Sequence, residues 1–65
     1  MKSLEELMVK AIRQFKREHK DYEIRTCYVM EFTGHGKECK DASFDIEYVE
    51  EECGEYKRTS IEVEA

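Results

Sequence analysis

Residues 43–63 read SFDIEYVEEECGEYKRTSIEV and contain two runs in which apolar and polar side chains alternate. Successive side chains of an extended strand point to opposite faces, so this alternation predicts two strands that each bury one face. The residues predicted on the buried face are Phe44, Ile46, Tyr48, Thr59, Ile61 and Val63. The segment therefore predicts a β-hairpin with one apolar face.

The residues between the two runs indicate how the hairpin turns. Glycine adopts positive φ at little cost, so we interpret Cys53 and Gly54 as a two-residue turn with Gly54 in the left-handed conformation. This turn would place Phe44 opposite Val63, and the other buried-face residues would then meet in pairs without a bulge.

The amino-terminal part of the chain has the apolar spacing of a helix. Apolar side chains at steps of three and four residues form one stripe, consisting of Leu4, Leu7, Met8, Ala11, Ile12 and Phe15. Ser3 and Glu6 have the spacing of a capping box, and basic residues follow in the last turn. We expect an amphipathic helix from about residue 4 to about residue 19, with His19 partly covered at its end.

Residues 22–33 alternate again and predict a first strand. Strict alternation puts Tyr22, Ile24, Tyr28, Met30 and Phe32 on the face toward the helix. The predicted fold class is α+β: one amino-terminal amphipathic helix packed on a three-stranded antiparallel meander, in the order α-β-β-β.

The same alternation defines a face of the sheet that the helix leaves uncovered. It would carry apolar and aromatic residues toward one end and carboxylates toward the other, and these are our candidate partner-binding residues: Cys27, Val29, Glu31, Asp45, Glu47, Val49, Tyr56, Arg58 and Glu62. Such a face is commonly only solvated, but clustered carboxylates cost stability and are typical of a surface that meets a basic partner.

The stretch TGHGKECKD, residues 33–41, places His35 and Cys39 near each other. Zinc sites take about four ligands that converge, and in this fold Cys27 and Cys53 lie too far away to complete one within a single chain. We interpret the stretch as an exposed hairpin loop and expect no metal, cofactor or catalytic centre; a metal site at an oligomer interface stays open. Because the sequence pattern predicts neither a pocket nor a catalytic pair of side chains, we expect a non-enzymatic protein.

Length and charge restrict the partners. The chain has 65 residues, which make one domain spanning residues 1–65, and its net charge of −5 opposes binding to nucleic acid and to anionic membranes. Three cysteines and the absence of a long apolar run indicate a cytoplasmic protein with reduced thiols, of which Cys39 and Cys53 should be exposed.

These observations favour a small acidic protein-binding module with a regulatory or inhibitory role. Its partner would be a basic protein, or a second copy in a homodimer formed through the unprotected edge of the first strand. A homo-oligomer that stores a small ligand or metal is an alternative. A designed chain without biological function is another, since proline is absent and 42% of the residues are charged.

Overall fold

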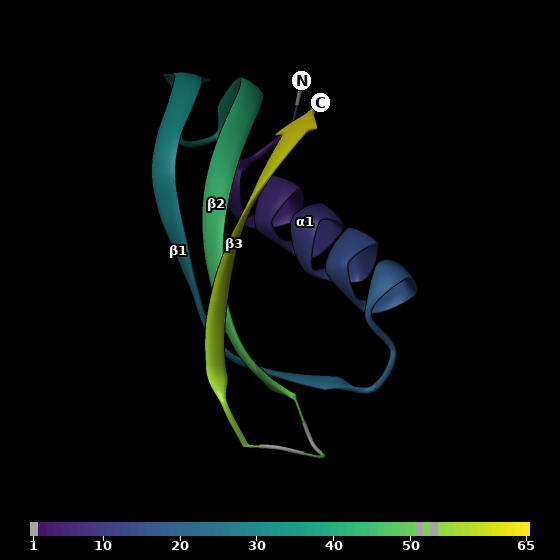
Figure 1. Ribbon diagram of the computed structural model, residues 1–65. Coiled ribbons are helices and arrows are strands. Elements are labelled where there is room, and N and C mark those ends of the chain that lie inside the picture. The colour runs from purple at the N-terminus through teal and green to yellow at the C-terminus, as the bar shows by residue number, and fades with distance from the viewer. Residues whose placement is uncertain (1, 51, 53) are drawn as a thin grey trace.

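One helix lies across one face of a three-stranded antiparallel sheet (Figure 1). The computed structural model describes residues 2–50, 52 and 54–65. The elements are α1 (Leu4–Glu18), β1 (Tyr22–His35), β2 (Glu38–Glu50) and β3 (Tyr56–Glu64), and the strand order β1-β2-β3 makes β2 central. The predicted α-β-β-β architecture is confirmed.

The helix begins and ends where local chemistry satisfies its free backbone groups. The Ser3 hydroxyl accepts the Glu6 N–H at 3.2 Å, and the Glu6 carboxylate accepts the Ser3 N–H at 3.4 Å. At the other end the His19 N–H donates to the Phe15 carbonyl at 2.8 Å. The capping box is therefore present as predicted, and the His19 ring lies against the rings of Phe15 and Tyr22, with centroid separations of 4.8 and 5.1 Å.

The core forms between the apolar stripe of α1 and the face of β2 and β3 that α1 covers. Three helix residues spaced by four, Leu7, Ala11 and Phe15, are fully buried. The sheet residues that pack with them are Cys39, Ala42, Phe44, Ile46, Tyr48, Ile61 and Val63. The alternation in the sequence therefore identified this buried face, with one exception: Thr59 is only half-buried.

The pairing of β2 with β3 differs from the predicted register by two residues. Phe44 lies opposite Ile61 and Ile46 opposite Thr59, and the last pair before the turn is Val49 with Tyr56. A shift of two residues leaves every side chain on its predicted face, since the side-chain period of a strand is two. The predicted two-residue turn is wrong because this register needs a longer connection.

The conformation predicted for the glycine of this connection is confirmed. Gly54 has φ +65° and donates its N–H to the Glu50 carbonyl at 2.8 Å. Cys53, the other residue of the predicted turn, lies outside the described residues.

Strand β1 departs from strict alternation. Its pairing with β2 shifts register at three places: Arg25 and Met30 are extra residues on β1, and near the β1–β2 turn Lys40 is an extra residue on β2. Residues directly opposite on antiparallel strands share a face, so Cys27 opposite Ile46 and Val29 opposite Phe44 lie on the helix side of the sheet. The expectation that they lie on the uncovered face is wrong, as is the placement of Tyr28 on the helix side, because each bulge exchanges the faces of the residues that follow it.

Most of the stretch 33–41, which was predicted as a loop, belongs to the two strands. Strands β1 and β2 continue to His35 and Glu38 and leave a turn at Gly36 and Lys37. Lys2 pairs with Cys39 through two backbone hydrogen bonds of 2.7 and 3.3 Å. This contact with the amino-terminal segment buries Cys39, so its predicted exposure is wrong.

Candidate functional site

The face of the sheet away from α1, called the outer face below, is dominated by carboxylates. We assign residues to it from the register, because their partners alternate with the buried residues of β2 and β3. Its acidic residues are Glu23, Glu31, Asp41, Asp45, Glu47, Glu62 and Glu64. Among the described residues of this face that are paired with a neighbouring strand, one is basic, Arg58. The outer face is therefore more acidic than the chain as a whole.

Most of the predicted binding residues lie on this face. The sequence placed Glu31, Asp45, Glu47, Val49, Tyr56, Arg58 and Glu62 there, and the register agrees. Cys27 and Val29 lie on the opposite face, as described above. The predicted carboxylates therefore lie together on the outer face. The predicted apolar residues do not, because Cys27 and Val29 lie on the helix face.

The carboxylates of the outer face differ in whether neighbouring side chains donate hydrogen bonds to them. Glu47 accepts a hydrogen bond from the Arg58 guanidinium at 3.0 Å, and Asp45 accepts one from the Ser60 hydroxyl at 2.6 Å. Glu31 and Glu62 lie on either side of Ser43, and within residues 2–50, 52 and 54–65 neither forms an ion pair. These two side chains are the carboxylates best placed to meet an external cation.

The apolar end of the outer face is smaller than predicted. Val49 is almost fully buried although it lies on this face, whereas its neighbour Tyr56 is 66% exposed. The adjacent Lys57 projects to the other side, opposite Tyr48, and a hydrogen bond to Glu50 together with the Glu50 charge raises the pKa of Lys57. Tyr56 is therefore the aromatic group that a partner on this end would contact.

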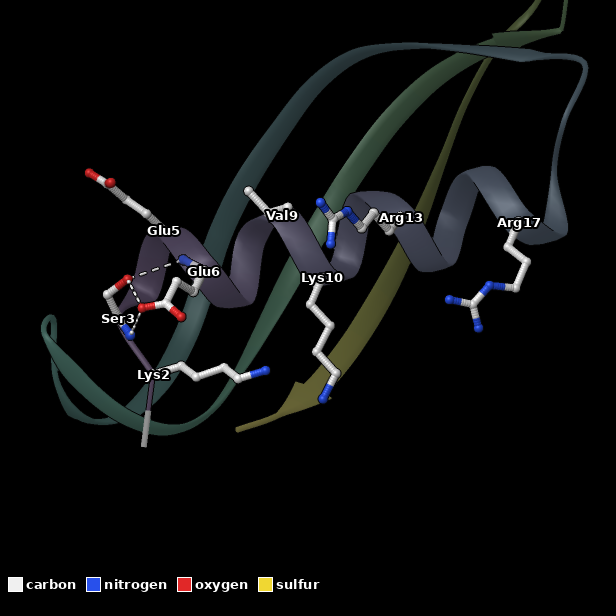
Figure 2. Close-up of a pocket in the computed structure, with 8 residues that line it drawn as sticks. All are labelled: Lys2, Ser3, Glu5, Glu6, Val9, Lys10, Arg13 and Arg17. Carbon is white, nitrogen blue, oxygen red and sulfur yellow. Dashed lines mark hydrogen bonds between the residues drawn. The ribbon is translucent and has the colours of Figure 1, made fainter.

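A second charged surface lies on α1 and was missed from the sequence. Lys2, Lys10, Arg13 and Arg17 line a hollow along the helix together with Ser3, Glu5, Glu6 and Val9 (Figure 2). Glu6 is engaged in the helix cap, and Lys10 donates to the Glu64 carbonyl at 2.5 Å. The spacing of Lys10, Arg13 and Arg17 at three and four residues could have revealed this basic stripe. Charge is thus separated between a basic helix surface and an acidic sheet surface.

His35 and Cys39, which were considered for metal binding, lie on the paired ends of β1 and β2 beside the β1–β2 turn. The Cys39 thiol donates to the backbone carbonyl of His35 at 2.9 Å, and the His35 residue is exposed. Among the described residues no three His, Cys, Asp or Glu side chains are grouped so that they could hold a metal ion. In the same part of the chain, no helix is both long and apolar enough to cross a membrane.

Comparison with protein-family models, with curated proteins and with solved structures found no significant match to this chain.

The two described thiols should differ in reactivity. Cys39 is fully buried, so we expect iodoacetamide to modify it only after denaturation. Cys27 is half-buried, and burial raises the pKa of its thiol, which lowers the reactive thiolate fraction near pH 8. It should react in the native protein, more slowly than in urea. Peptide mapping by mass spectrometry after a short pulse measures both rates; equal labelling of Cys39 with and without urea would contradict its burial.

Proposed function

We propose that the protein is a small cytoplasmic protein-binding module whose outer face binds a basic, extended segment of a partner protein. The observation that carries the proposal is the concentration of carboxylates on the outer face, with Arg58 as the basic residue in register among those the structure describes. Like charges that lie close together on a sheet are destabilising, and a cationic partner relieves that cost.

The spacing of the carboxylates suits an extended ligand. Asp45 and Glu47 on β2, and Glu62 and Glu64 on β3, are each two residues apart, which corresponds to about 6.6–6.8 Å along a strand. A peptide with lysine at every second position has the same repeat on one of its faces. Tyr56 at the end of this face can stack on the stem of a lysine or arginine.

A peptide titration tests the proposal. The probe is a capped octapeptide that alternates lysine and threonine, followed by NMR on labelled protein at low ionic strength. We expect the amide signals of β2 and β3 to shift, and the affinity to fall as salt screens the charges. The triple variant Glu31→Gln/Asp45→Asn/Glu62→Gln should weaken binding about tenfold, since each exposed pair contributes roughly 0.2–1 kcal/mol.

A matched variant separates this face from net charge. Glu5→Gln/Glu18→Gln/Glu55→Gln removes the same number of charges from exposed residues outside the outer face and should leave binding nearly unchanged. If the two triple variants weaken binding equally, the affinity depends only on the net charge of the protein, and the outer face is not the binding site.

A further inference from the structure

Strand β1 carries most of the apolar surface that the described part of the chain exposes. Six large apolar or aromatic side chains are exposed there, and four of them lie on β1: Tyr28, Val29, Met30 and Phe32. β1 is also an edge strand, because the strand order β1-β2-β3 of the described residues places β2 on one side of it and no strand on the other. Its free side therefore offers unpaired backbone groups beside apolar side chains, which natural edge strands usually avoid.

Two of these side chains are exposed because α1 does not reach them. Val29 and Phe32 lie opposite Phe44 and Ala42, which are buried, yet they are 38% and 46% exposed. In Figure 1 the part of β1 that leads into the β1–β2 turn lies at the edge of the sheet away from α1. The core surface thus continues beyond the helix, onto a strand that nothing covers among the described residues.

The side chains of β1 are arranged almost symmetrically about Tyr28. Ile24 and Phe32 lie four residues to either side of it and both belong to the helix face, as do Cys27 and Val29 one residue to either side. Arg25 and Glu31 lie three residues to either side and carry opposite charges. Register shifts interrupt the pairing with β2 on both sides of Tyr28, at Arg25 before it and at Met30 and the Thr33–Gly34 step after it. A strand with this pattern is complementary to itself when it runs in the opposite direction.

We infer that β1 pairs antiparallel with β1 of a second copy, about a twofold axis at Tyr28. Ile24 then lies opposite the second copy's Phe32, Val29 opposite its Cys27, and Arg25 opposite its Glu31. The two sheets join into one of six strands with both helices on the same face, and Val29 and Phe32 become covered between them. This contact shares Glu31 with the proposed partner-binding face, but it is formed mainly by the apolar residues of β1 and does not depend on that function.

A matched pair of valine variants tests the dimer. Sedimentation equilibrium of the full chain should show a monomer–dimer equilibrium. Val29→Lys should raise the dimer dissociation constant by about tenfold or more, because it buries a lysine in the contact. Val9→Lys changes another exposed valine, 47% exposed on α1, and should leave the dissociation constant unchanged. Circular dichroism verifies that both variants fold. A wild-type chain that stays monomeric at millimolar concentration, or equal effects of the two variants, would overturn the inference.

A charge exchange tests the register. Arg25→Glu and Glu31→Arg should each weaken the dimer, since each places like charges opposite each other across the axis. The double variant Arg25→Glu/Glu31→Arg restores opposite charges and should recover most of the wild-type dissociation constant. If the double variant is weaker than both single variants, the two residues do not face each other and the antiparallel arrangement about Tyr28 is wrong.

Discussion

Replacing Phe15 with alanine should lower the free energy of unfolding by about 3–5 kcal/mol, the range for removing a buried aromatic side chain. Phe15 is fully buried, and its ring lies 4.8 Å from that of Tyr48 and 6.5 Å from that of Tyr22, measured between centroids. It therefore joins the end of α1 to both β1 and β2. A core of this size seldom supplies more than roughly 3–5 kcal/mol, so the variant should be largely unfolded at room temperature.

Urea denaturation followed by circular dichroism measures this loss, at a protein concentration low enough to keep the chain monomeric. Val9→Ala is the control, because Val9 is exposed on the same helix and alanine is the better helix former, so its effect should stay within about 0.5 kcal/mol. A Phe15→Ala variant that loses less than about 1 kcal/mol would show that the helix end is not anchored by this ring.

The second large effect is expected at Gly34. This residue has φ +105°, and a Cβ atom placed on it would lie 2.4 Å from the backbone carbonyl oxygen of Glu38. That oxygen belongs to the paired strand and cannot move aside as a flexible side chain would. Gly34→Ala should therefore cost about 2–3 kcal/mol, from the strained φ and the displaced backbone together.

The other two glycines provide graded controls for Gly34. Gly54 has φ +65° with open space around it, so Gly54→Ala should cost about 1 kcal/mol through backbone strain alone. Gly36 has neither positive φ nor a close neighbour, and Gly36→Ala should stay within about 0.5 kcal/mol. Denaturation of the three variants should rank them in that order. If Gly34→Ala were as mild as Gly36→Ala, the tight approach of the two strands at this turn would be refuted.

The sequence alone determined the elements and the faces of β2 and β3. The alternation is strong over residues 41–48 and 58–64, because the outer-face positions there are charged or hydroxylic and the buried-face positions are apolar, with Thr59 as the exception. The carboxylates of the outer face followed directly from this alternation. The basic stripe on α1 was predictable by the same reasoning.

The register of the hairpin between β2 and β3 was not determined by the sequence. Phe44 can lie opposite Ile61 or Val63, and both arrangements keep every apolar side chain on the buried face. The period of two cannot distinguish registers that differ by two residues. In the structure β2 ends at Glu50 and β3 begins at Tyr56, which leaves a longer connection than the predicted two-residue turn.

Only the tertiary structure decided on which face of the sheet each side chain of β1 lies. Residues 27–30 are all apolar or aromatic, so their pattern is compatible with either face, and the bulges at Arg25 and Met30 are set by pairing with β2. The burial of Cys39 likewise depends on Lys2, which is far from it in sequence. Local periodicity reports which side chains can be buried together, whereas bulges and long-range backbone pairs depend on where the neighbouring strand lies.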